Sequence, residues 1–132
     1  MIQDLERLTK PDYKAKLNQC IHCGMCLQAC PTYRVHKTEM EAPRGRIALI
    51  EAASEGIISL ADFQGTVTQH LTKCLDCRSC ETACPSGVRY SDLFAESRIV
   101  IEKNRKIGVS ERFILLLGMK VFLPNKIGRA HV

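Results

Sequence analysis

The sequence predicts an all-α domain, and three features of its 132 residues indicate that class. Two cysteine runs repeat at an offset of 54 positions, and each ends in Cys-Pro. The 43 residues between the runs carry apolar side chains at helical spacing. No part of that connection alternates apolar and polar residues as a β-strand would. We therefore expect short helices at the cysteine runs, joined by longer helices.

The first 19 residues predict an amphipathic lead-in that breaks between two helical turns at Pro11 and Asp12. Its apolar anchors are Leu5, Leu8 and Leu17. After the first cysteine run, Pro31 is expected to stop the helix and to open an exit turn over residues 31–34.

The connection predicts two helices. Pro43 suits the first turn of one helix, and Gly56 supplies its stop. The apolar positions of that helix are Ile47, Ile50 and Ala53. The next helix begins near Asp62 and leads into the second cysteine run. Its stripe is interpreted as core rather than as a binding face, and consists of Phe63, Val67 and Leu71.

Two more helices are expected after a turn at Ser86 and Gly87. Ser91 is expected to cap the first, which runs to about Lys103. Its apolar side carries Leu93, Phe94, Val100 and Ile101. A last helix from Gly108 is too apolar to stand alone, because it contains residues 113–119 and 121–123. Packing on downstream sequence is the favoured interpretation, and a partner or a membrane surface are the alternatives.

All eight cysteines of the chain lie in the two runs. Both runs read C-x2-C-x2-C-x3-C-P, the spacing with which bacterial two-cluster ferredoxins hold [4Fe–4S] clusters. Three thiolates at steps of three on a tight loop can hold three corners of one cube. The fourth follows about one helical turn later and points away from them.

In two-cluster ferredoxins, the fourth cysteine of each run ligates the other cluster. We therefore assign cluster 1 to Cys20, Cys23, Cys26 and Cys84. We assign cluster 2 to Cys74, Cys77, Cys80 and Cys30. Neither site is complete without the other run, so the two halves are expected to depend on each other for folding.

Two other interpretations of the cysteines fit the sequence less well. A disulfide framework requires an oxidising compartment, and the N-terminal sequence has no apolar signal-peptide core. Zinc modules usually separate two C-x2-C pairs by a longer loop, which these compact runs lack. His22 is a spacer among sufficient thiols and is not expected to be a ligand.

Eight thiolates fill two [4Fe–4S] clusters and leave no iron corner open for substrate, which favours electron transfer over catalysis. No catalytic residue is therefore expected on this chain. Gly24 is expected to allow the backbone to approach a sulfide closely. Cations beside the runs would stabilise a reduced cluster, although they also suit a solvated surface or a docking face. They are Arg34, Lys73, Arg78 and Arg89.

The formal net charge of +5 is not strong evidence for nucleic-acid binding. Residues 126–132 look like the translation of a sequencing-library adapter, so we expect the natural chain to depart near Asn125. Without Lys126 and Arg129, the charge of +5 becomes +3. A metal-stapled binding module, including one for nucleic acid, remains the distant alternative.

The same residues carry a family resemblance. The stretch from Cys20 to Tyr33, the Pro43-Arg-Gly-Arg-Ile47 segment and the stretch from Cys74 to Tyr90 resemble the iron–sulfur subunits of glycolate oxidase, also called glycolate dehydrogenase. The similarity covers roughly residues 14 to 98. It implies an α-helical ferredoxin domain of the succinate dehydrogenase iron–sulfur type, with two [4Fe–4S] clusters on the eight cysteines.

The resemblance also implies partners. Such subunits take electrons from an FAD-containing 2-hydroxyacid dehydrogenase subunit and pass them toward quinone at the membrane. Family members continue into a C-terminal region with further cysteine-rich modules, whereas no cysteine follows Cys84 here. Related subunits of anaerobic glycerol-3-phosphate dehydrogenase, lactate-utilisation and heterodisulfide reductase systems share much of this domain and are the alternatives.

These inferences divide the chain into a cluster domain at residues 1–104, a segment at 105–125 that leads onward, and the adapter-like tail at 126–132. The longest apolar run is too short to span a bilayer. We expect a cytoplasmic protein, with peripheral attachment to the inner face of the membrane as an open possibility.

Overall fold

The computed structural model describes residues 6–59, 62–104, 110 and 113–118. Within these ranges the regular secondary structure is helical and contains no strand. The predicted all-α class is therefore confirmed for the described part of the chain.

The lead-in consists of two short helices, α1 (Glu6–Thr9) and α2 (Pro11–Leu17). Pro11 begins α2, so the predicted break between two helical turns is confirmed. Leu8 and Leu17 are buried, as expected of anchors. The third predicted anchor, Leu5, lies outside the described residues.

The first cysteine run forms α3 (Cys26–Ala29), and α4 (Pro31–His36) follows. The predicted exit turn over residues 31–34 is therefore wrong. Pro31 does end α3, but it also occupies the first position of α4. The same restricted φ that stops one helix is suited to the start of the next, where no backbone N–H donor is needed.

A 3₁₀ turn, η1 (Glu39–Glu41), leads into α5 (Pro43–Ser54). The helix begins at the expected proline and ends before Gly56, which has a φ of +77°. Its predicted core residues Ile47, Ile50 and Ala53 are all buried.

The second half of the connection begins as a π-helix, η2 (Phe63–Val67), and continues as α7 (Thr68–Thr72). The predicted stripe of Phe63, Val67 and Leu71 is buried, which confirms its role in the core. The wider π turn was not expected. It coincides with a hydrogen bond of 2.7 Å from the Thr68 hydroxyl to the Phe63 carbonyl, which satisfies a carbonyl oxygen at the start of the segment.

The second cysteine run forms α8 (Ser79–Thr82), and α9 (Tyr90–Asn104) is the longest helix among the described residues. The predicted N-cap at Ser91 is wrong, because the helix already begins at Tyr90. The Ser91 amide instead donates to the Glu81 carboxylate at 2.5 Å. A side chain from α8 therefore satisfies the first turn of α9, and its negative charge is favourable there.

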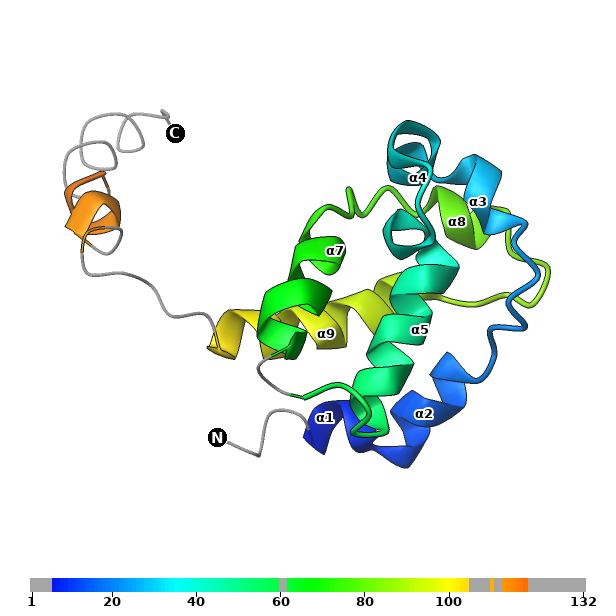
Figure 1. Ribbon diagram of the computed structural model, residues 1–132, viewed down its shortest axis with the longest axis horizontal. Helices are drawn as coiled ribbons and strands as arrows, with labels where there is room; N and C mark the ends of the chain where they lie inside the picture. The colour runs from blue at the N-terminus through cyan, green and yellow to red at the C-terminus, as the bar shows by residue number, and fades with distance from the viewer. Residues whose placement is uncertain (1–5, 60–61, 105–109, 111–112, 119–132) are drawn as a thin grey trace, which may run out of the picture.

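Figure 1 shows how these helices are arranged: α3, α4 and α8 gather at one end and α1 and α2 at the other. Helix α5 runs between the two groups, and α9 crosses α5. Contacts join α3 to α8, α1 to both α5 and α9, and α5 to α9. The apolar core packs against several of the cysteines, including Cys20, Cys74, Cys80 and Cys84. The core and the cysteine runs are therefore built on the same helices.

Beyond α9, residues 113–118 are helical, and the side chains of Phe113 through Leu117 are exposed. The rest of the predicted last helix, including residues 121–123, lies outside the described residues, as does the tail at 126–132. Within the part of the chain that the structure describes, no helix has the length and apolarity needed to span a membrane.

Gly45 provides a test of the packing between α5 and η1. A Cβ atom at this position would lie 1.9 Å from the Glu39 carbonyl oxygen, so one of the two backbones has to move. We expect Gly45→Ala to destabilise the fold by about 3 kcal/mol, measured as a shift of the denaturant midpoint.

Gly65→Ala is the matched control. A Cβ atom at Gly65 meets nothing within 4 Å, and its φ is not positive. This substitution should change stability by less than ~1 kcal/mol. Equal midpoints for the two variants would contradict the close approach described at Gly45.

Candidate metal centre

The two cysteine runs adopt the same unusual backbone. In the first run His22 and Gly24 have φ values of +53° and +85°, and in the second Asp76 and Arg78 have +51° and +59°. The left-handed residues thus stand at equivalent positions, immediately before and after the second cysteine of each run. Such turns orient successive backbone N–H groups toward one concavity, an arrangement common at phosphate and iron–sulfur sites.

Cavity 1 lies at the first run and has an open volume of about 280 Å³, including solvent. The thiols that line it are Cys20, Cys23, Cys26 and Cys84. Three come from the first loop, and the fourth comes from the end of the second run. The backbone N–H of Val88 donates to the Cys84 sulfur at 3.4 Å, so one sulfur of this set already has an amide donor.

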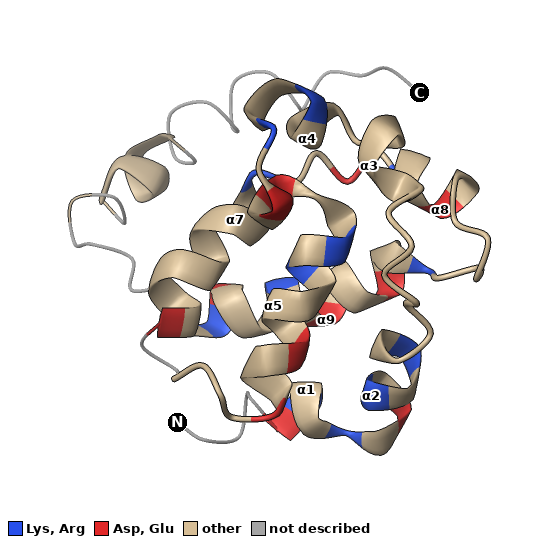
Figure 2. Ribbon diagram, turned by 45° about the vertical axis from the view of Figure 1, so that its right-hand side comes forward, with Lys and Arg blue, Asp and Glu red and all other residues tan. Residues whose placement is uncertain are grey.

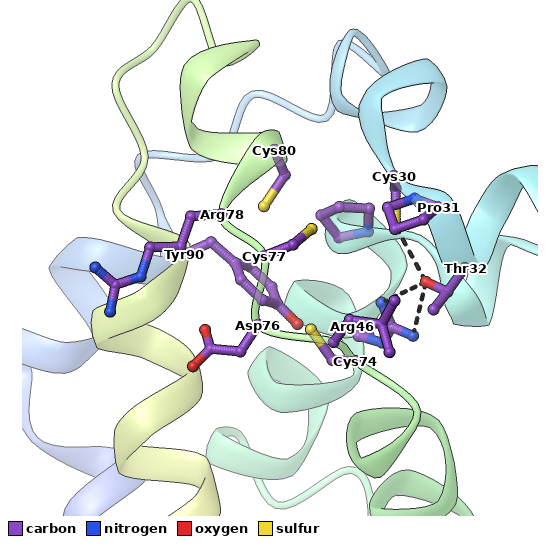
Figure 3. Close-up of a pocket in the computed structure, with 12 residues that line it drawn as sticks. Cys30, Pro31, Thr32, Arg46, Cys74, Asp76, Cys77, Arg78, Cys80 and Tyr90 are labelled. Carbon is purple, nitrogen blue, oxygen red and sulfur yellow. Dashed lines mark hydrogen bonds between the residues drawn. The ribbon is translucent and has the colours of Figure 1, made fainter.

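Cavity 2 lies at the second run and has an open volume of about 330 Å³, including solvent. The thiols that line it are Cys30, Cys74, Cys77 and Cys80. Figure 3 shows their neighbours, among them Arg46 from α5 and Tyr90 from α9. The structure thus brings together the same two groups of four that the crosswise assignment requires, while the ligation itself stays a prediction.

A third cavity shares residues with both sites. Its walls combine thiols of cavity 1 with Cys80 of cavity 2. The apolar side chains of Pro43, Ile47 and Val88 line it as well, together with Arg44 and Tyr90. The two thiol sets are therefore neighbours across a partition that residues of α5, Val88 and the start of α9 provide.

The eight thiols differ in burial and in acidity. Cys23 and Cys77 are exposed, whereas Cys30 is buried. Burial, together with the charges of nearby thiolates, raises the pKa of Cys80 to about 12. Hydrogen bonds from Ser79 lower the pKa of Cys77 below its ordinary value of 9.0. Binding a metal at cavity 2 must therefore displace protons from the thiols, most of all from Cys80, whose pKa is raised.

The donor set fits a cluster better than a single ion. In the described part of the chain, no three Cys, His, Asp or Glu side chains converge closely enough to hold one metal ion. Tetrahedral zinc requires four sulfurs that each lie ~2.3 Å from one centre, whereas a cube spreads its thiolates over four corners. Four thiols around an open cavity match the second geometry.

Cavity 2 rests on a buried ionic network. Glu41 is 2% exposed and Arg46 is 1% exposed, and their side chains are joined at 3.1 Å. Glu41 also accepts from Lys73 at 2.7 Å and from His70 at 2.8 Å. Burial raises the pKa of Glu41, but the hydrogen bonds from Lys73 and His70 outweigh it, so the net shift is downward.

Arg46 connects this network to a cluster thiol. Its guanidinium donates to the His70 carbonyl at 2.8 Å and twice to the Thr32 hydroxyl oxygen at 3.2 Å. Thr32 in turn lies 3.1 Å from the Cys30 sulfur and donates to the Glu41 carbonyl at 2.9 Å. Figure 3 shows these bonds between Cys30, Thr32 and Arg46 as dashed lines.

Arg44 holds the loop of cavity 1 in an analogous way. It donates to the His22 carbonyl at 3.0 Å and makes two bonds to the Glu39 carboxylate at 2.7 and 2.9 Å. A Cβ atom on Gly24 would approach the Arg44 guanidinium to 2.7 Å. Gly24 thus gives this arginine access to the loop, while the expected approach to a sulfide stays a prediction.

The four cations that the sequence analysis named beside the cysteine runs lie in different surroundings. Lys73 pairs with Glu41, and Arg89 lies 3.4 Å from Asp92 while its side chain stays largely exposed. Arg78 lines cavity 2, and Arg34 is exposed. Arg44 and Arg46 were not identified from the sequence as charged residues of the two sites. Their place on one predicted helix between the cysteine runs was a usable signal.

Figure 2 shows Lys and Arg interspersed with Asp and Glu over the described helices rather than gathered by sign. Several pairs of opposite charge are in contact, including Arg7 with Glu96 at 2.9 Å. This distribution gives no support to the alternative of a nucleic-acid-binding module, which would present a one-sided basic surface.

Comparison with known proteins matches residues 16–88 to the family described as a 4Fe-4S dicluster domain. The chain is 44% identical over 109 residues to the glycolate oxidase iron–sulfur subunit of Escherichia coli (strain K12), an alignment that covers 83% of this chain and 26% of that one. It is 39% identical over 114 residues to the probable glycolate oxidase iron–sulfur subunit of Bacillus subtilis (strain 168), covering 86% and 25%.

A more distant similarity, 26% over 114 residues, links the chain to one component of a ferredoxin/F420H2-dependent CoB-CoM heterodisulfide reductase from Methanosarcina acetivorans, covering 86% of this chain and 63% of that one. No solved structure gives a significant match. The chain spans about a quarter of the length of the two glycolate oxidase relatives.

The buried network predicts a pH-dependent stability. Glu41→Gln removes a carboxylate that balances the buried Arg46, and should cost about 3–5 kcal/mol at neutral pH. Because the folded-state pKa of Glu41 is lowered, its contribution is complete above the ordinary value of 4.5 and is lost as the pH falls through the lowered value. The difference in denaturant midpoint between wild type and variant should therefore shrink below about pH 4.

Glu39→Gln is the matched control, because Glu39 pairs with Arg44 at 2.7 Å but its side chain is 50% exposed. Its effect should stay below ~1 kcal/mol. A Glu41→Gln variant as stable as this control would show that the network does not support the fold.

Proposed function

Because the chain belongs to the 4Fe-4S dicluster domain family, we propose that it relays electrons for a flavin-linked 2-hydroxyacid dehydrogenase, with glycolate as the favoured substrate of the partner. The observation that supports it most strongly is the grouping of all eight cysteines around two cavities, four to each. When bound there, each [4Fe–4S] cluster supplies a one-electron carrier with a fixed ligand set.

The chain's own residues suit this task. Thiols at both cavities complete the ligand sets, so no position is left open to bind a substrate. The Glu41–Arg46 network and Arg44 hold the two loops from inside, and the core packs directly against several ligands. Ligands that are held rigidly, in surroundings that partly exclude water, should change position little when the charge of a cluster changes.

The identity of the partner rests on the relatives. The two glycolate oxidase iron–sulfur subunits share 44% and 39% of aligned residues with this chain. We propose that an FAD-containing subunit oxidises the hydroxyacid, that electrons pass through the two clusters, and that quinone receives them at the inner face of the membrane. No residue of this chain is proposed to take part in the substrate chemistry.

The heterodisulfide reductase relative supports a second candidate within the same class. Under that alternative the domain performs the same relay, but a different redox subunit supplies or receives the electrons. Glycerol-3-phosphate dehydrogenase and lactate-utilisation systems stay further alternatives. In every case the proposed cluster domain is residues 1–104, and residues 105–125 lead toward the rest of the complex.

The crosswise ligation predicts which cluster each variant loses. The anaerobically reconstituted chain should contain about eight irons, and Cys30→Ser should retain about four. The EPR spectrum of reduced Cys30→Ser should match that of Cys77→Ser, because both substitutions remove a ligand of cluster 2. The spectrum of Cys84→Ser should match that of Cys23→Ser for the same reason at cluster 1.

These four variants control one another, since each removes one thiol. If Cys30→Ser instead matched Cys23→Ser, ligation would follow the order of the sequence and the exchange would be wrong. A wild-type chain with fewer than about seven irons after reconstitution would contradict the presence of two clusters.

The partner proposal predicts a glycolate-dependent reduction of the clusters. The reconstituted chain, mixed anaerobically with the FAD subunit of a glycolate oxidase, should lose visible absorption when glycolate is added. Glycerol-3-phosphate should have no effect, and Cys77→Ser should respond with a smaller amplitude. If the clusters were reduced by a glycerol-3-phosphate dehydrogenase subunit with its substrate, but not by the glycolate oxidase subunit with glycolate, the chain would be assigned to the glycerol-3-phosphate system.

A further inference from the structure

Tyr90 is a buried phenol without a hydrogen-bond partner. Its side chain is 3% exposed, and its hydroxyl is the buried side-chain polar atom that stays unsatisfied in the described part of the chain. Buried tyrosine hydroxyls normally find a partner, because leaving one unpaired away from water is costly. The position of Tyr90 therefore needs an explanation that the fold itself does not give.

The hydroxyl points into cavity 2. Tyr90 lines this cavity together with its four thiols, and Figure 3 shows the phenol oxygen directed toward Cys74. The pKa of Tyr90 is raised well above its ordinary value, first by burial and then by the neighbouring Cys74. An unpaired donor thus faces the place where sulfur atoms of a cluster would lie.

The ring has little freedom to find another partner. It stacks on Phe94 with centroids 5.7 Å apart and an angle of 18° between the rings. Tyr90 is the first residue of α9, and the adjacent Ser91 amide is held by the Glu81 carboxylate. Because helix, ring and neighbouring backbone are all fixed, the hydroxyl stays aimed at the cavity.

Tyr13 shows what an ordinary structural tyrosine does in this core. It is also buried, but its hydroxyl donates to the Leu93 carbonyl at 2.8 Å and lies 3.0 Å from the Ser97 hydroxyl. The core can therefore satisfy a buried phenol. The core gives the Tyr90 hydroxyl no such partner, so the lack of a partner is specific to the surroundings of cavity 2.

The two cavities also differ in their sulfur donors. At cavity 1, the Val88 amide donates to the Cys84 sulfur, and a backbone group persists whatever residue stands there. At cavity 2, Ser79 hydrogen-bonds to Cys77, and the Thr32 hydroxyl lies 3.1 Å from the Cys30 sulfur. The Tyr90 hydroxyl is a further polar group at cavity 2, and it can be removed without altering the backbone.

We propose that the Tyr90 hydroxyl donates a hydrogen bond to a sulfur of cluster 2, either that of Cys74 or a sulfide, and raises the reduction potential of that cluster relative to its value without the bond. The inference rests on the proposed binding of a cluster by Cys30, Cys74, Cys77 and Cys80. Reduction adds negative charge that is shared by the sulfurs, so a donor stabilises the reduced form more than the oxidised form.

Tyr90→Phe tests the proposal because it removes one oxygen and keeps the stacked ring. In an anaerobic redox titration followed by EPR, the midpoint of the signal that Cys77→Ser lacks should fall. We expect the ratio of reduced to oxidised cluster 2 at a fixed potential to drop about tenfold, equivalent to ~59 mV for a one-electron couple. The midpoint of cluster 1 should not change.

Tyr13→Phe is the matched control, since it removes a buried phenol oxygen from the same core but away from the cysteines. It should leave both midpoints unchanged. If Tyr90→Phe left the cluster 2 midpoint at the wild-type value, or shifted both clusters equally, the proposal would be overturned. A wild-type chain without clusters would instead refute the proposed function, so the two failures are distinguishable.

A second measurement keeps the hydroxyl and therefore does not depend on the folding of Tyr90→Phe. Biosynthetic replacement of tyrosine by fluorotyrosine makes the phenol a stronger donor. The cluster 2 midpoint should then rise in the otherwise wild-type chain and should not respond in the Tyr90→Phe background. An unchanged midpoint in the labelled wild type would contradict the hydrogen bond.

Discussion

The buried guanidinium of Arg46 connects several segments of this domain by hydrogen bonds. Arg46 lies on α5 and bonds to Glu41 of η1, to Thr32 of α4 and to the His70 carbonyl of α7. A buried arginine is tolerable only when its donors are used and its charge is balanced, and both conditions are met here. Because Thr32 also contacts Cys30, the same group that secures three segments of the fold supports one wall of cavity 2.

Features with a local cause were predictable from the sequence. The spacing of the cysteines predicted that the first three thiols of each run lie on one short loop, and they line one cavity together. The stripe of Phe63, Val67 and Leu71 predicted a core face, since burial of one side of a helix imposes that period. Gly24 and Gly87 both have positive φ, as turns at these positions require.

Features that depend on distant partners were not predictable. Ser91 has the residue type of a cap, but Glu81 lies close enough in space to satisfy the helix start from ten positions away. Pro31 is compatible with both the end and the beginning of a helix, and only packing decides between them. Arg46 and Tyr90 look like ordinary surface and core residues, because a sequence does not show whether a buried polar atom is paired.

The stretch from Cys84 to Tyr90 touches both cavities. Its first residue lines cavity 1, its Val88 amide bonds to a sulfur there, and its last residue closes cavity 2. Because this segment is short and is held at both ends, the distance between the two proposed clusters can vary little. Electron tunnelling weakens roughly exponentially with distance. In the proposed relay, a fixed separation would therefore make transfer between the two clusters insensitive to thermal motion, and encounters with partners at the surface would set the overall rate.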